Sequence, residues 1–168
     1  TPKFKEQYNK GDSVKRGDWI MNSLKKFEDF IRERAIRKCS PDILRAKFLV
    51  REVEKRKRFI ENILKKFTIR DDNANYIVEN CYDVIRALVK AKLLIDGFDT
   101  GTSHEADISY LRVMGFSERE VEIVNELRYL RNSIKYYGRI LNAVYAEKII
   151  KFLEETYPKL KNLVKEAT

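Results

Sequence analysis

The chain has few of the residues that break helices, cross-link a fold or bind metals: six Gly, three Pro, two Cys and one His among 168 residues. It has no run of about 18 apolar residues, so no segment is expected to cross a membrane. Cys39 and Cys81 form no CxxC pair, and a single His cannot complete a zinc site with them. These absences predict reduced thiols, no bound metal and no cofactor.

The first 17 residues lack the apolar segment of a signal peptide. They are polar and charged, and they show no helical periodicity. We therefore expect a flexible basic tail over residues 1–17, followed by one domain over residues 18–168. The absence of targeting and membrane-spanning segments favours a cytoplasmic protein.

Negative charge is in deficit, because 35 Lys and Arg residues face 26 Asp and Glu residues, which gives a net charge of +9. Such an excess favours polyanionic partners such as RNA or nucleotides. Lys, Arg, Glu and Ile are abundant and Gln7 is the only Gln, a composition typical of heat-adapted organisms that use charges in ion-pair networks. Charge alone therefore leaves two alternatives, a polyanion partner and a solvated surface.

Helical periodicity dominates the sequence, and no stretch alternates as strands do. A first helix is predicted to follow Asp18, with apolar residues at three- and four-residue steps: Ile20, Leu24, Phe27, Ile31 and Ala35. Ser40 and Pro41 fit the N-cap and first position of a long helix that runs to about Phe67. A third helix is expected from Asp71 or Asp72 to Gly97.

Three further helices are predicted from residues that cap helix N-termini: Thr102 with Glu105, Ser117 with Glu120, and Asn142. The first should run through Val113 and the second to about Leu141, whereas Pro158 can kink or break the last. Short connections between long helices favour antiparallel neighbours. The sequence therefore predicts an all-α protein, a single up-down bundle of about five to six helices.

The helix expected over residues 117–141 has two different faces on a wheel of about 100° per residue. Its apolar face comprises Ile123, Leu127, Leu130, Ile134, Tyr137 and Leu141. Its opposite face comprises Arg128, Arg131, Asn132, Lys135, Tyr136 and Arg139. Cations near a helix C-terminus compensate the macrodipole, but like charges three or four residues apart repel. The second face is therefore either solvated or paired within the protein, or it binds an anion.

Residues 130–138, LRNSIKYYG, resemble the signature of the HEPN superfamily, in which an Arg, often followed by Asn, precedes a His by four to six residues. The order of helices over about Trp19 to Leu163 is also similar. The resemblance implies a HEPN-like bundle that binds RNA or nucleotides and forms a homodimer with two motifs facing one cleft. It also implies that the protein is either a metal-independent ribonuclease or a non-catalytic member, and that a minimal nucleotidyltransferase is a candidate partner.

The chain departs from the family where the His is expected, because Tyr136, Tyr137 and Gly138 occupy those positions. A Tyr with a pKa of about 10 is a poor base at neutral pH, although it can stack on a base or donate to a phosphate. Arg131 can still hold a phosphate through two hydrogen bonds. The preferred hypothesis is non-catalytic binding of nucleotide or RNA phosphates. The alternatives are a metal-independent ribonuclease that uses Arg131 and Tyr136, with His104 as a further candidate, and an interaction partner of a minimal nucleotidyltransferase.

Two other features leave alternatives open. His104 is either a partly buried residue beside a helix cap or a general base that folds back toward Arg131. The basic run from Lys55 to Arg58 is either a solvated surface or a patch that follows a phosphate backbone.

Overall fold

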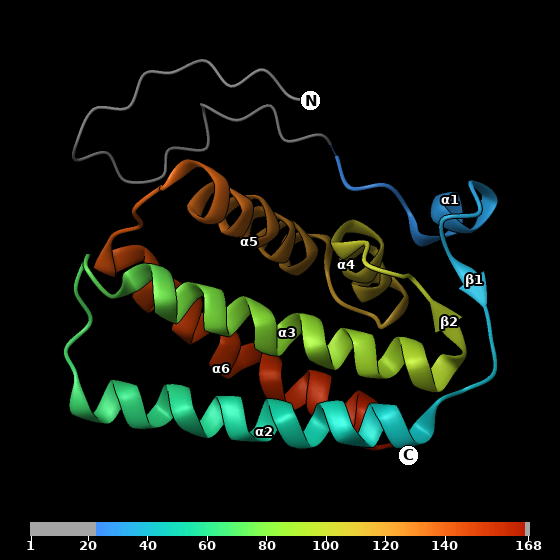
Figure 1. Cartoon of the computed structure of the whole chain (residues 1–168), viewed down its shortest axis with the longest axis horizontal. Helices are drawn as coiled ribbons and strands as arrows, with labels where there is room; N and C mark the ends of the chain where they lie inside the picture. Colours follow the sequence, from blue (N-terminus) through green and yellow to red (C-terminus); the bar gives the residue numbers. More distant parts are fainter. Residues whose placement is uncertain (1–22, 167–168) are drawn as a thin grey trace.

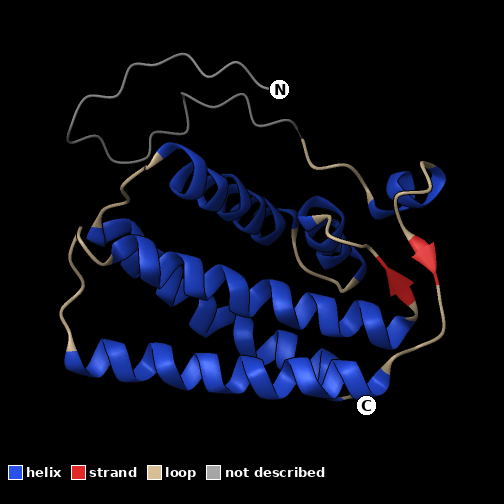
Figure 2. Ribbon diagram, in the orientation of Figure 1, coloured by secondary structure: helices blue, strands red, loops and turns tan. Residues whose placement is uncertain are grey.

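The computed structural model describes residues 23–166, apart from the side chains of Tyr136 and Tyr137. Within that range the protein is an all-α bundle, as predicted (Figures 1 and 2). Its helices are α1 (Phe27–Arg32), α2 (Ile43–Lys66), α3 (Ala74–Asp96), α4 (His104–Val113), α5 (Glu118–Tyr137) and α6 (Ala143–Lys165). The predicted tail over residues 1–17, and the part of the first helix predicted before residue 23, lie outside the described residues.

Helix α3 is the centre of the bundle. It buries thirteen of its 23 residues, whereas α2 buries only three of 24, so α2 is an outer helix with one apolar stripe. Helices α2, α4, α5 and α6 all contact α3. Successive long helices α2, α3, α5 and α6 alternate in direction, which gives the up-down arrangement seen in Figure 1.

Several helix ends follow from local capping, as the sequence predicts. The Ser117 hydroxyl accepts a hydrogen bond from the Glu120 backbone, and the Glu120 side chain accepts one from the Ser117 backbone N–H. Asn142 caps α6 by accepting from the backbone N–H of Tyr145 at 2.8 Å. Gly97 ends α3 in the left-handed conformation with φ of 78°.

The first three predicted N-termini are wrong in position. Helix α3 begins at Ala74 after the N-cap residue Asn73, and not at Asp71 or Asp72. Helix α1 begins only at Phe27 and is six residues long. Leu24 is buried without being helical, and the chain turns after the helix at Arg34, which has φ of 57°. Helix α2 is capped by Asp42 and not by Ser40. The backbone N–H of Asp42 donates to the Leu94 carbonyl of α3, so a tertiary contact selects the cap.

Two later helix boundaries also differ from the prediction. Ser103, and not Thr102, caps α4 by accepting from the Ala106 backbone. Helix α5 ends at Tyr137, before the expected Leu141, because Gly138 adopts a left-handed conformation with φ of 64°. Arg139, which follows Gly138, therefore lies in a loop and not on the face of a helix.

Helix α6 continues through Pro158, which the sequence suggested could break it. Proline removes the N–H that would bond the carbonyl four residues earlier, here that of Glu154. Pro158 and Glu154 are both exposed, so water can bond the carbonyl that loses its partner. The helix is held instead by its buried face: Ile149, Phe152, Leu153, Thr156 and Leu160.

One short antiparallel sheet was not predicted. Strand β1 (Arg37–Lys38) pairs with β2 (Phe98–Asp99), with Arg37 opposite Asp99 and Lys38 opposite Phe98. Two-residue strands are too short to produce an alternating pattern in the sequence. The pairing anchors the α1–α2 connection to the end of α3. Across residues 23–166, no helix has the length and hydropathy needed to cross a membrane.

Candidate functional site

The buried face of α5 lies closer to Arg128 and Arg131 than the helical wheel predicted. Its buried apolar residues are Val121, Val124, Leu127 and Leu130. Arg128 follows Val124 by four residues and Arg131 follows Leu127 by four, so each Arg lies about 40° from a buried residue on the helix. The prediction that both arginines lie opposite the core is therefore wrong. Both are half-buried at the margin of the α5–α3 contact.

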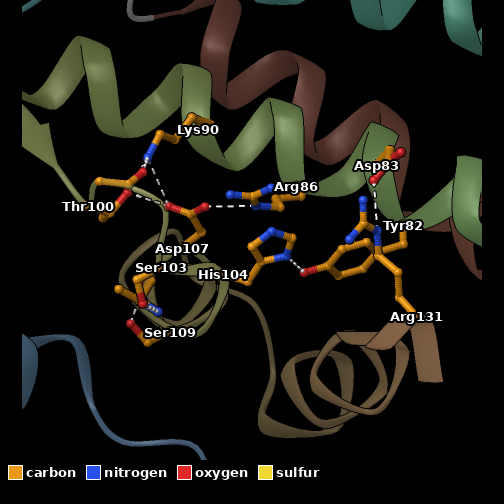
Figure 3. A network of polar contacts seen from close by, with 12 residues as sticks. Tyr82, Asp83, Arg86, Lys90, Thr100, Ser103, His104, Asp107, Ser109 and Arg131 are labelled. Atoms are coloured by element: carbon orange, nitrogen blue, oxygen red, sulfur yellow. Dashed lines mark hydrogen bonds and ion pairs between the residues drawn. The ribbon is translucent and has the colours of Figure 1, made fainter. Parts of the chain in front are cut away.

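The Arg131 side chain extends from α5 toward Tyr82 and Asp83 of α3, as Figure 3 shows. Its Nε lies 3.4 Å from Oδ1 of Asp83, and its guanidinium carbon lies 5.8 Å from the centroid of the Tyr82 ring. The buried Nε makes no hydrogen bond, and within the described residues the other nitrogens of this guanidinium make none either. A guanidinium carries five N–H donors, so Arg131 retains capacity to bind an anion.

Asp83 neutralises Arg131 only in part, because it also contacts a second arginine. Its Oδ2 accepts from Nη1 of Arg56, on α2, at 3.2 Å. One carboxylate therefore bridges α2 and α5 over α3. Two cations sharing one carboxylate keep a net positive charge at this point of the surface.

His104 is the first residue of α4. It lies beside the Tyr82 hydroxyl, and Arg131 lies on the opposite side of the Tyr82 ring (Figure 3). Its Nδ1 lies 2.9 Å from the Tyr82 hydroxyl, and the two rings are stacked with an interplanar angle of 13°. Burial raises the pKa of Tyr82, so the phenol keeps its proton and can donate it to Nδ1. His104 and Arg131 thus contact the same side chain, although 27 positions separate them in the sequence.

The environment of His104 keeps its imidazole neutral. Burial lowers its pKa to about 4, and the charges of Arg86 and Arg131 act in the same direction against the weaker opposing effect of Asp107 and Asp83. A base is most effective when its pKa lies near the working pH. His104 is therefore poorly suited to accept or donate protons at neutral pH.

A buried carboxylate, that of Asp107, holds two of the cations near Tyr82 in place. Asp107 of α4 is fully buried, and its Oδ2 accepts from Nε of Arg86 at 2.9 Å. Its Oδ1 lies 3.4 Å from Nζ of Lys90 and accepts from the Thr100 hydroxyl. Figure 3 shows this chain of contacts running along α3 toward His104. Asp107 thereby fixes Arg86 beside the imidazole.

The remaining predicted site residues are not all brought together. Nε of Arg128 donates to Oδ1 of the buried Asn125 at 3.0 Å, and its guanidinium stacks on Tyr129. Asn132 is half-buried and Lys135 is exposed. The Tyr136 side chain lies outside the described part of the structure. Arg139 lies in the loop after α5, which Asn75 fixes by accepting from the Leu141 N–H and donating to the Arg139 carbonyl.

The described residues around Tyr82 carry more positive than negative charge. We use the term arginine cluster for Arg86, Arg128 and Arg131, whose charges all act on the Tyr82 hydroxyl. With Arg56 and Lys90 added, the group has five cations. Four of them pair with two carboxylates, Asp83 and Asp107, and Arg128 pairs with neither. An excess of fixed cations raises the local positive potential, which attracts ligands that carry several negative charges.

Tyr82, Asp83 and Arg86 are site residues that were not predicted from the sequence. Tyr82 reads as an ordinary core aromatic, because the residues around it on α3 are apolar. A signal was present, however, since Asp83, Arg86 and Lys90 stand three and four residues apart and form one polar stripe on this otherwise buried helix.

The described residues contain no cluster of three or more His, Cys, Asp or Glu side chains arranged to hold a metal ion. Both cysteines are free; Cys39 is exposed, whereas burial raises the pKa of the Cys81 thiol to about 12. Comparison of the chain with models of known protein families, with curated proteins and with solved structures gives no match.

Proposed function

We propose that this protein binds the phosphate groups of RNA or nucleotides at the arginine cluster and does not cleave them. The observation that carries the proposal is Arg131, a half-buried guanidinium positioned by Tyr82 and Asp83 with its hydrogen-bond donors unspent. Lys135, exposed one turn further along α5, extends the positive surface beyond the cluster. Phosphate oxygens match the geometry of guanidinium donors, and a polyanion matches the net charge of +9.

A second candidate, a metal-independent ribonuclease, is favoured by one arrangement of side chains alone. His104 and Arg131 lie against the same tyrosine, as a base and a phosphate ligand would in an RNA-cleaving site. The low pKa of His104 argues against this role, because the imidazole would be a weak base and would carry no proton to give a leaving group at neutral pH. Binding is therefore the better-supported function.

Arg131→Ala should weaken the binding of single-stranded RNA by about 10- to 150-fold, because a charge-assisted contact to phosphate contributes about 1.5–3 kcal/mol. The slope of log K against log salt should fall by about 0.7, the value for one phosphate contact on a single strand. Fluorescence anisotropy across a salt series measures both quantities. Arg131→Lys should keep the slope and lose affinity, since lysine keeps the charge without the planar fork.

Arg37→Ala is the matched control, because Arg37 carries the same charge, is exposed on β1 and pairs with Asp99 and not with Asp83 or Asp107. Equal losses in Arg131→Ala and Arg37→Ala would reduce the effect to net charge and refute the assigned site. The same samples, incubated with a chelator and run on a denaturing gel, should return intact RNA. Shortened RNA that depends on His104 would instead favour the ribonuclease.

A further inference from the structure

An aromatic groove lies along α2 and the start of α3. It has a volume of about 470 Å³, within the range of about 300–1,000 Å³ that small-ligand sites occupy. Three of its lining residues are large and unusually exposed: Phe59 at 53%, Phe67 at 62% and Tyr76 at 71%. Aromatic rings exposed together around one groove indicate a binding surface more than a defect of packing.

The groove is continuous with the site of the proposed function. Phe59 and Ile63 stand four residues apart on α2, Phe67 follows at the C-cap of that helix, and Tyr76 and Asn80 stand four apart on α3, so the groove follows the line between the two helices. Arg56 is hydrogen-bonded to one of its lining residues, Asn80. Nη1 of Arg56 donates both to Oδ1 of Asn80 and to Oδ2 of Asp83, each at 3.2 Å. Asp83 is also the carboxylate beside Arg131, so one arginine connects the groove to the arginine cluster.

The charge around the groove favours a polyanion over a second copy of this chain. Between Lys55 and Asp72 the sequence has seven cations and three carboxylates, Glu61, Asp71 and Asp72; Asp72 lines the groove and pairs with Arg70. Arg58, Lys65 and Lys66 are exposed and form no ion pair within the described residues. A second copy would bring the same positive surface, and like charges facing each other oppose association.

The two asparagines of the groove are already hydrogen-bonded within the protein, and Arg70 and Asp72 pair with each other. Asn73 accepts from the Arg70 backbone N–H and donates to the Thr68 carbonyl. Asn80 accepts from Arg56 and donates to the Tyr76 carbonyl. The groove therefore offers aromatic faces and aliphatic surface to a ligand and has few free groups to read a base edge. Stacking on such faces accepts any base.

We propose that this groove holds an unpaired base of single-stranded RNA while the adjoining phosphates lie on the arginine cluster. The proposal rests on the proposed function and specifies its ligand, because a base in a duplex is stacked on its neighbours and cannot enter the groove. Binding at the groove is sequence-tolerant, since stacking and not hydrogen bonding to base edges holds the base.

The test compares the wild-type chain with the double variant Phe67→Ala/Tyr76→Ala. Both side chains are mostly exposed, so circular dichroism should show an unchanged fold. A labelled oligouridylate of about 12 nucleotides should bind the variant about tenfold more weakly, the loss expected for stacking on one base. Inorganic polyphosphate, which has charge and no bases, should bind both proteins equally. Phe48→Ala is the control, since Phe48 is as exposed as Phe59, on the same helix, and does not line the groove.

Each failure points to a different error. If wild-type protein binds polyphosphate and RNA, and the double variant binds RNA just as well, the groove proposal is overturned and the arginine cluster stands. If wild-type protein binds neither probe at low salt, the proposed function itself fails. Equal loss of both probes in the double variant excludes stacking as the cause. A wild-type dimer in light scattering that becomes monomeric in the double variant would assign the groove to a second copy and overturn the proposal.

Discussion

Replacing Asp107 with Asn should destabilise the fold by about 3 kcal/mol, the largest loss expected from a single charge-removing change. Asp107 is fully buried and compensates Arg86 and Lys90, whose side chains are only 25% and 18% exposed. Asparagine keeps the volume of the side chain but leaves two poorly hydrated cations without a carboxylate. Urea denaturation followed by circular dichroism measures the change in the free energy of unfolding.

Asp72→Asn makes the same chemical change in an exposed ion pair. Asp72 and its partner Arg70 are both more than 60% exposed, and such surface pairs contribute about 0–1 kcal/mol. This control should therefore unfold close to the wild-type midpoint. If Asp107→Asn were equally mild, the polar network along α3 would not be the structural support of the arginine cluster described above.

Gly97→Ala should destabilise the protein by about 3 kcal/mol for two separate reasons. Gly97 has φ of 78°, a conformation that costs an L-residue about 1–2 kcal/mol. A Cβ atom at this position would also lie 2.6 Å from the backbone oxygen of Cys39, which cannot move freely because the Cys39 N–H donates to the Gly97 carbonyl. Thermal or urea unfolding measures the combined cost.

Gly115→Ala separates these two causes. Gly115 also has a positive φ, of 85°, but a Cβ atom there meets nothing within 4 Å. Its substitution should cost only the conformational part, about 1–2 kcal/mol. A loss in Gly97→Ala no greater than in Gly115→Ala would mean that the α1–α2 connection moves to accommodate the methyl group, and that β1 and β2 do not fix it.

The parts of the fold that the sequence predicts correctly are those decided by neighbouring residues. Ser117 with Glu120 and Asn142 define helix starts through contacts three residues away, and these starts are confirmed. Ser40 and Pro41 satisfy the same local rules, yet α2 starts later because Asp42 is held by the Leu94 carbonyl. Pro158 is accommodated because it lies on the exposed face of α6. Local rules fail where a contact from another helix selects among alternatives.

The candidate site was predictable only in part, for the same reason. Arg131 could be selected from the sequence as the centre of a cationic segment. The orientation of its side chain could not be predicted, because a helical wheel does not reveal that α3 is the helix that covers this side of α5. The contact between His104 and Tyr82 joins α4 to α3 across 22 positions, and no local pattern encodes it. His104 consequently had two open interpretations until the structure placed it beside the arginine cluster.

The single histidine allows the central claim to be tested directly, because its imidazole resonances in an NMR spectrum need no assignment. In the free protein, His104 should titrate with a pKa of about 4. Since Arg86 and Arg131 help to lower that pKa, a phosphate bound to the arginine cluster should offset their charge and raise it. RNA that binds tightly while the titration of His104 stays unchanged would place the ligand elsewhere and contradict the account.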